Sequence, residues 1–412
     1  MNPTKELQYC TLQRIGNSGL NQVTVSFPNV KLSRLSSSTQ RYAKKIERGL
    51  IFCRGKKRPD EVLVNRNEAK LYEHAAMDQL AVAKEASVLS AGSPVADHIP
   101  EFPWGDMPED EYYRLKRVEN RQSYFKSSRG VKLFTQVWVP LDYPKPKAII
   151  CMVHGYGNNT SWTFQNTALM FTEMGYVAMA SDLQGHGNSE GLKGYIPDVD
   201  GCAQDCLDFF HSVLETDEFR GIPKFLYGES LGGAICLLIH FKQPDEWNGA
   251  ILAAAMCKIS DNMKPRWPLP EILTVLAYFF PTWAVVPTND LVDKSVTHPW
   301  KRELARHNPG RYAGKPRLGS VAEFLRVTAV LESRLQDVSL PVLIIHGDED
   351  VVTEPAVSVA LYEKAKSEDK TLKMYKGMRH SLLQGETDEN VAILVKDITS
   401  WLRQRVEQLH AL

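Results

Sequence analysis

After residue 120, short runs of apolar residues alternate with longer segments in which apolar residues recur at helical spacing. Continuous apolar strands separated by helices are typical of a parallel sheet that is covered on both faces. The pattern predicts strands at 132–139, 148–153, 176–180, 225–227, 250–256 and 342–345, and a weaker one at 372–375. It predicts helices at 163–174, 199–214, 231–241, 321–335, 356–366 and 389–406. We therefore expect a doubly wound α/β fold with a mostly parallel central sheet and helices on both faces.

One segment interrupts this alternation. Residues 257–318 hold eight of the 23 prolines, together with the aromatic residues Trp267, Phe279, Phe280, Trp283 and Trp300. This segment is too irregular for a sheet crossover. We predict an inserted helical cap at about 257–318, over the end of the sheet where open α/β folds bind their ligands. Its aromatic residues could contact a substrate or only form the small core that a cap needs, and both alternatives stay open.

The N-terminal segment is strongly basic. Residues 1–58 hold twelve lysines and arginines and two acids, so they carry +10 and the rest of the chain −10, although the whole chain is neutral. A basic, hydroxyl-rich segment without an apolar core of about 7–15 residues is typical of an organellar transit peptide. We predict a transit peptide at 1–58 and a chloroplast location, with the cytoplasm or a peripheral membrane position as alternatives. Residues 59–110 are predicted to hold an accessory helix at 66–91 and a proline-rich linker, before a main domain at 111–412.

The overall composition is that of an ordinary globular protein, with 43% hydrophobic and 24% charged residues among 412. A neutral chain has no bulk electrostatic reason to bind nucleic acid, so we expect no nucleic-acid partner. The seven cysteines are odd in number and scattered, which argues against a disulfide scaffold and favours a reducing compartment. No second pair of ligands accompanies Cys202 and Cys206, so we expect no zinc site.

The pattern Gly-x-Ser-x-Gly occurs twice, around Ser189 and around Ser230. It forms a nucleophile elbow only where a strand precedes the serine and a helix follows it. Ser230 lies between the apolar run 225–227 and the predicted helix 231–241, whereas no strand directly precedes Ser189. Ser230 is therefore the candidate nucleophile, and Ser189 is predicted to be a turn residue.

A serine hydroxyl is a weak nucleophile until a base takes its proton. His380 follows the last predicted strand and is the candidate base, because the chain order in α/β-hydrolases is serine, acid, histidine. The loop after the strand 342–345 offers Asp348, Glu349 and Asp350 as the acid. An oxyanion hole is expected from backbone N–H groups, one in the turn after the strand 148–153 and one directly after the nucleophile, at Tyr156 and Leu231.

Five motifs together resemble those of a known family. They are His154-Gly-Tyr-Gly157, Asp182-Leu-Gln-Gly-His-Gly187, Gly228-Glu-Ser-Leu-Gly-Gly233, His346-Gly-Asp-Glu-Asp350 and Gly377-Met-Arg-His380. Residues from about 110 to 408 resemble the monoacylglycerol lipase family of α/β-hydrolases, in particular its plant branch, which includes lysophospholipase-like proteins and caffeoylshikimate esterases. The resemblance implies the α/β-hydrolase fold without metal or cofactor, and a site made of Ser230 as nucleophile, Asp350 as acid, His380 as base, and Tyr156 and Leu231 as oxyanion donors.

The resemblance also implies an activity. We expect a serine esterase that cleaves a monoacylglycerol or a lysophospholipid through an acyl-enzyme, with a small-molecule ester or lipid as partner and peripheral membrane contact through the cap. Three alternatives remain: a phenylpropanoid esterase of the caffeoylshikimate type, a non-catalytic ligand receptor, and a lysophospholipid acyltransferase. The last is suggested by His240-Phe-Lys-Gln-Pro-Asp245. The chain departs from the family at Arg379, where an aromatic residue often stands, and at Asn158, where the animal enzymes have an acid.

Overall fold

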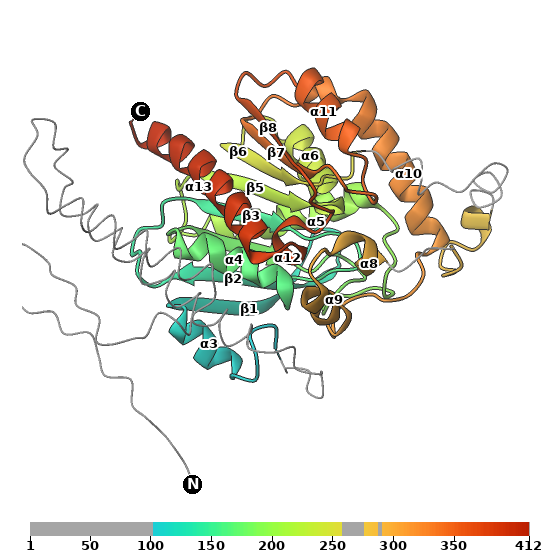
Figure 1. Ribbon diagram of the computed structural model, residues 1–412, viewed down its shortest axis with the longest axis horizontal. Helices are drawn as coiled ribbons and strands as arrows, with labels where there is room; N and C mark the ends of the chain where they lie inside the picture. The colour runs from blue at the N-terminus through green and yellow to red at the C-terminus, as the bar shows by residue number, and fades with distance from the viewer. Residues whose placement is uncertain (1–101, 258–275, 287–290, 412) are drawn as a thin grey trace, which may run out of the picture. The chain divides into compact units, whose positions relative to one another are not determined.

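The computed structural model of the chain describes residues 102–257, 276–286 and 291–411 (Figure 1). Contacts divide the chain into two compact units, and the described residues all belong to the second, Ala96–Leu412. The predicted transit peptide, the accessory helix and most of the linker lie outside the described residues, as do parts of the predicted cap. Within this unit, Trp104 stacks on Tyr112 of the first described helix.

An eight-stranded sheet forms the centre of this unit. Its strands are β1 (Val118–Lys126), β2 (Lys132–Pro140), β3 (Ile149–Val153), β4 (Val177–Ser181), β5 (Lys224–Glu229), β6 (Gly249–Ala253), β7 (Val342–Gly347) and β8 (Lys370–Tyr375). They lie in the order β1-β2-β4-β3-β5-β6-β7-β8. β2 runs antiparallel to both of its neighbours, and all other pairs are parallel. The carboxyl ends of β3, β5, β7 and β8 therefore meet at one edge of the sheet.

Helices cover both faces of this sheet. One buried cluster joins the sheet to α5 (Val199–Leu214), α6 (Leu231–Lys242), α10 (Leu318–Ser333) and α11 (Pro355–Lys364). The cluster on the other face joins it to α3 (Glu109–Leu115), α4 (Thr163–Glu173), α12 (Leu382–Gly385) and α13 (Asp388–Ala411). Every residue of β3, β4 and β6 is buried, which explains why these strands are continuous apolar runs in the sequence.

All the predicted strands and helices after residue 120 are present, with the largest difference at the end of α13. β1 and α3 were not predicted. β1 is an edge strand that exposes most of its side chains, so its sequence carries little apolar signal. β2 is buried on both faces rather than alternating, and the polar side chains of Thr135 and Gln136 form hydrogen bonds to Ser123 and to the buried Thr160.

The described part of the predicted cap region contains the segment 276–286 and the short helices α8 (Leu291–Ser295) and α9 (Pro299–Arg306). Ala277, Val286 and Leu318 form a small buried cluster there. Tyr278 and Phe279 are 82% and 65% exposed, so these aromatic side chains lie outside that cluster.

In the part of the chain that the structure describes, no helix combines the length and the apolar character needed to cross a membrane.

Replacing Phe225 tests the packing of the core between β5 and α13. Its side chain is fully buried and meets Trp401 of α13 edge-on, with ring centroids 6.1 Å apart. Replacing it with alanine leaves a cavity, so we expect Phe225→Ala to lower the free energy of unfolding by about 3–5 kcal/mol in chemical denaturation. Ile393→Ala, at a half-exposed position on α13, is the control and should change it by less than about 1 kcal/mol. Equal effects of the two variants would contradict this packing.

Candidate active site

Ser230 lies at the sharp turn between β5 and α6. Its backbone has a φ of 55° and a ψ of −118°, an unfavourable conformation for a residue with a side chain. Two hydrogen bonds stabilise this backbone conformation: Ser230 N–H donates to Ala253 O at 3.0 Å, and Met256 N–H donates to Ser230 O at 2.9 Å. The turn from β6 therefore holds the serine backbone in place, as a nucleophile elbow requires.

Two glycines make this turn possible. A Cβ at Gly232 would overlap the carbonyl oxygen of Val153, and a Cβ at Gly228 would overlap the carbonyl oxygen of Gly232. These contacts are with backbone, which cannot move aside as the end of a flexible side chain could. Gly232 is thus required by the close approach of the turn to the end of β3, and Gly228 by the tightness of the turn itself.

Asp350 and His380 meet at the carboxyl ends of β7 and β8. The His380 imidazole donates from Nδ1 to Asp350 Oδ2 at 2.6 Å, which leaves its Nε2 free of this contact. Asp348, the other aspartate of the loop, is exposed and accepts a hydrogen bond from Gly377 N–H instead. The structure therefore places Asp350, and not Asp348, beside the candidate base.

Asp350 is surrounded by donors. Val352 N–H and Thr353 N–H donate to its Oδ1 at 2.7 and 3.1 Å, and His346 Nε2 lies 3.0 Å from its Oδ2. Burial alone would raise the pKa of Asp350, but the charge and hydrogen bonds of His380 and His346 hold that pKa well below its ordinary value. Asp350 is therefore an anion at any pH at which His380 could act as a base. Sequence reasoning missed His346 and Thr353, although His346 stands in a quoted motif.

The turn at 154–157 lies directly against Ser230. A Cβ built on Gly155 would stand 3.2 Å from the Cβ of Ser230. Among the described residues, neither Tyr156 N–H nor Leu231 N–H donates to a protein acceptor. Leu231 is the first residue of α6, so its N–H also lies at the positive end of the helix dipole. Two such N–H groups beside a serine can stabilise a developing oxyanion.

Asp182, in the second motif, binds the residues just after this turn to the loop after β4. Its carboxylate is fully buried and accepts hydrogen bonds from Thr160 N–H at 2.6 Å and from Asn188 N–H at 2.7 Å. Burial raises its pKa, and these bonds oppose that rise. Ser189 is also buried, donates to Asp182 O at 2.6 Å and accepts from Phe134 N–H at 2.8 Å. The prediction that Ser189 is a structural turn residue is therefore confirmed.

A second carboxyl group lies next to the nucleophile. Glu229 accepts hydrogen bonds from Tyr227 Oη and, at 2.5 Å, from Gln384 Nε2. Burial raises the pKa of Glu229 to about 7, although these bonds and the nearby His380 pull it down. Glu229 and Gln384 carry no chemistry in the usual triad, so nothing in the sequence pattern pointed to them.

The loop that carries His380 is bound to α8 and the residues after it. Ser381 N–H donates to Ser295 O at 2.9 Å, and Thr297 N–H donates to Gly385 O at 3.0 Å. Glu386 is buried, and its carboxylate accepts from Arg379 N–H at 2.8 Å. Among the described residues, Ser230 Oγ and the His380 imidazole share no hydrogen bond. Such bonds are often long without substrate and shorten in the complex.

Two other features lie apart from this site. His240 is at the far end of α6 from Ser230, where its Nε2 accepts from Ser339 N–H at 3.1 Å, which is a structural role. Asp198, Asp200 and Glu323 bring carboxylate oxygens within 4.8 Å of one another, but Arg326 pairs with Asp200 and Glu323. A cation of the chain itself thus already compensates this acidic group.

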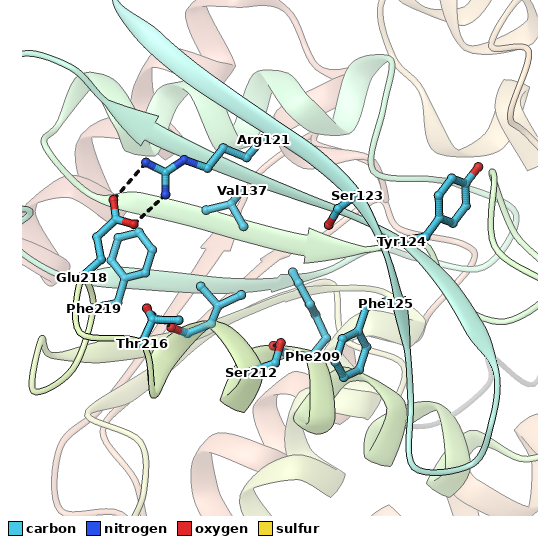
Figure 2. A pocket seen from close by; sticks show the side chains of 11 residues that line it. Arg121, Ser123, Tyr124, Phe125, Val137, Phe209, Ser212, Thr216, Glu218 and Phe219 are labelled. Carbon is cyan, nitrogen blue, oxygen red and sulfur yellow. Dashed lines mark hydrogen bonds and ion pairs between the residues drawn. The ribbon is translucent and has the colours of Figure 1, made fainter.

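A cavity of about 280 Å³ is lined by residues of β1, β2 and α5 and of the turn after α5. Figure 2 shows Arg121 of β1 joined to Glu218 at its rim, with Phe125, Phe209 and Phe219 around it. Ser212 donates to a carbonyl of its own helix. Arg121, Glu218 and Ser212 therefore already have partners, and none of the predicted site residues lines this cavity.

The arrangement of strands, the elbow and the order serine, aspartate, histidine define an α/β-hydrolase. Residues 144–388 match the Hydrolase_4 family, described as serine aminopeptidase, S33, and the chain belongs to this family.

Known proteins support this assignment. The chain is 43% identical to the caffeoylshikimate esterase of Arabidopsis thaliana over 306 residues, 74% of this chain and 92% of that protein. It is 28% identical to the monoglyceride lipase of Mus musculus over 281 residues, 67% of this chain and 88% of that protein. A soluble variant of monoglyceride lipase from Saccharomyces cerevisiae, solved with a substrate analog, shares the fold with a TM-score of 0.62 at 24% identity, over 70% of this chain and 96% of that one. The chain is a serine esterase of this family.

Glu229 gives the fold a pH dependence. The pKa of Glu229 is raised to about 7 in the folded state, above its value in the unfolded chain, so the folded state binds the proton more tightly. Its contribution to stability is full below the unfolded pKa near 4 and is lost as the pH rises through about 7. We expect the stability advantage of the wild type over Glu229→Gln to shrink between pH 5 and pH 8, in urea titrations at each pH. Glu332→Gln, at an exposed position on α10, is the matched control, and a constant difference for Glu229→Gln would contradict the raised pKa.

Proposed function

We propose that the protein hydrolyses a monoacylglycerol or a related single-chain carboxylic ester, with Ser230 as nucleophile. The observation that carries this proposal is the strained elbow at Ser230, with the turn at 154–157 against it and the Asp350–His380 pair at the same edge of the sheet. A strained backbone at such a point is maintained at an energetic cost and is typical of a functional residue.

The reaction has two stages. His380 takes the proton of Ser230 Oγ on its Nε2 while Oγ attacks the ester carbonyl carbon, and Asp350 holds the imidazole from Nδ1. Tyr156 N–H and Leu231 N–H stabilise the oxyanion, and His380 then protonates the leaving alcohol as the acyl-enzyme forms. Water, deprotonated by His380, attacks the acyl carbon. The released serine oxygen recovers the proton, and the products are a carboxylic acid and an alcohol.

The surface of the cap region supports a lipid substrate. Tyr278, Phe279, Phe280 and Trp283 are all at least 41% exposed, and the rings of Phe280 and Trp283 stack at 4.2 Å. Neighbouring exposed aromatic residues are typical of a surface that contacts a membrane or another apolar partner. We infer that this surface contacts a membrane peripherally while the enzyme takes a lipid ester from it. We propose a chloroplast location, because the composition of the basic segment 1–58 is typical of a transit peptide.

A phenylpropanoid ester of the caffeoylshikimate type is the second candidate substrate. Its support is the 43% identity to a caffeoylshikimate esterase, against 28% to a monoglyceride lipase. Both classes of substrate present an ester carbonyl to the same nucleophile, so the proposed mechanism applies to either.

Ser230→Ala tests the nucleophile. Without Oγ no acyl-enzyme can form, so we expect kcat/KM for the best ester substrate to fall by about 10⁴-fold or more. The serine of the second Gly-x-Ser-x-Gly pattern provides the control: Ser189→Ala should lower stability by about 1–3 kcal/mol, through its two lost hydrogen bonds, while folded protein keeps its turnover. Wild-type turnover by Ser230→Ala would contradict the mechanism.

A substrate panel separates the two candidates. We expect the full chain to hydrolyse monoacylglycerol with a higher kcat/KM than lysophospholipid or caffeoyl shikimate, because the exposed aromatic residues favour an acyl chain over a polar ester. The readout is acid release from each ester, with Ser230→Ala protein as the blank. A higher kcat/KM on caffeoyl shikimate would instead support the second candidate.

A further inference from the structure

Gln384 of α12 contacts three separate parts of the site. Its Oε1 accepts from Asn158 Nδ2 at 3.2 Å, directly after the turn that carries Tyr156, and from Thr163 Oγ1 at 3.0 Å. Its Nε2 donates to Glu229 Oε2 at 2.5 Å, next to the nucleophile. Gln384 also lies four residues after His380 in the chain. One amide thus links the oxyanion turn, the nucleophile elbow and the histidine loop.

The direction of these hydrogen bonds is set by their chemistry. The carboxylate of Glu229 can only accept, so the Gln384 amide must present its NH₂ there and its oxygen to Asn158. Asn158 must then present its own NH₂ to Gln384, as it does. The chain of donors therefore runs from Asn158 through Gln384 to Glu229, and each residue suits only the neighbour that it has.

We propose that Gln384 is a positioning residue for ester hydrolysis and that Asn158 and Glu229 are its two matched partners, which together hold the oxyanion turn in place against the nucleophile elbow. This inference rests on the proposed function, because the three side chains hold in place the elbow of Ser230 and the turn of Tyr156, whose catalytic roles are themselves proposed. None of the three side chains acts on the substrate in it.

The match predicts a specific incompatibility. In Asn158→Asp, a carboxylate would face Gln384 Oε1, and both groups can only accept. Rotating the Gln384 amide by half a turn would relieve this contact, but it would bring the amide oxygen against the carboxylate of Glu229. The site is satisfied again only if the group at 229 can donate. A glutamine at 229 can do so, with Tyr227 Oη as donor to its other end. Asn158→Asp should therefore be harmful alone and tolerated together with Glu229→Gln.

The experiment is a double-variant cycle on the full chain with a monoacylglycerol or, if that ester is preferred, caffeoyl shikimate. We expect Asn158→Asp to lower kcat/KM about tenfold or more at pH 8, since the half-buried Gln384 oxygen then faces a carboxylate instead of a donor. The double variant Asn158→Asp/Glu229→Gln should recover most of this loss. Asn120→Asp is the matched control, because Asn120 Nδ2 donates to Gln136 Oε1 at the same 3.2 Å on β1 and β2, and we expect it to change kcat/KM less than twofold.

A pH profile separates positioning from a general loss of structure. The titratable groups that face Glu229 are Tyr227 of β5 and His380 after β8, and a protonated Glu229 can itself donate to a turned Gln384. The ratio of kcat/KM between Asn158→Asp and wild type should therefore rise as the pH falls from 9 to 6. In the double variant, which has no carboxyl group at 229, this dependence should be absent.

Several outcomes would overturn the proposal. If the loss of kcat/KM in the double variant equals the product of the two single losses, the three side chains do not act together. The same conclusion follows if the ratio of kcat/KM between Asn158→Asp and wild type does not change with pH. If Asn158→Asp does not fold, the same cycle is measured by the yield of folded protein, and no recovery in the double variant counts against the match. A fully active Ser230→Ala would overturn the proposed mechanism instead, so the two failures are distinguishable.

Discussion

The site depends on one close approach of backbones. The turn after β5 comes so near the end of β3 that Gly232 has no room for a side chain, and it is so tight that Gly228 has none beside the backbone of Gly232. This approach raises Ser230 into a strained conformation and at the same time places Leu231 N–H beside the turn at 154–157. The nucleophile and both proposed oxyanion donors are thus positioned by a single contact of main chains, and the sheet order, which makes β3 and β5 neighbours, is what permits it.

Around this contact, two carboxyl groups near the same imidazole differ in their protonation. Asp350 receives hydrogen bonds from several N–H groups and from two histidines, so its pKa lies well below the ordinary value. Glu229 receives only those of Tyr227 and Gln384, and burial prevails and raises its pKa. The surroundings of the two carboxyl groups, and not their residue types, therefore determine their charge. Asp350 is a permanent anion that orients His380, whereas Glu229 can change its charge close to neutral pH.

The sequence was informative where the physical requirement is local. Apolar runs revealed the buried strands, and the elbow glycines revealed Ser230, because a tight turn between strand and helix restricts its residues strongly. It was uninformative for β1, whose exposed edge position leaves no apolar signal. It also could not reveal Glu229, Gln384 or Thr353. Their partners lie up to 226 residues away in the chain, and only the folded sheet brings them together.

The contacts of the histidine loop bear on how specificity and catalysis are related in this chain. The segment from Asp293 to His298 donates to or accepts from residues on both sides of His380, and Glu386 joins Thr297 to Arg379 N–H. The described part of the cap region is thus hydrogen-bonded to the residues on both sides of the base. Asp350, in contrast, is held by donors of its own loop, Val352 N–H and Thr353 N–H. Catalysis needs the imidazole at a fixed distance from Ser230, so these hydrogen bonds make the segment 293–298 part of the support of the base, and a change in that segment would alter kcat as well as KM.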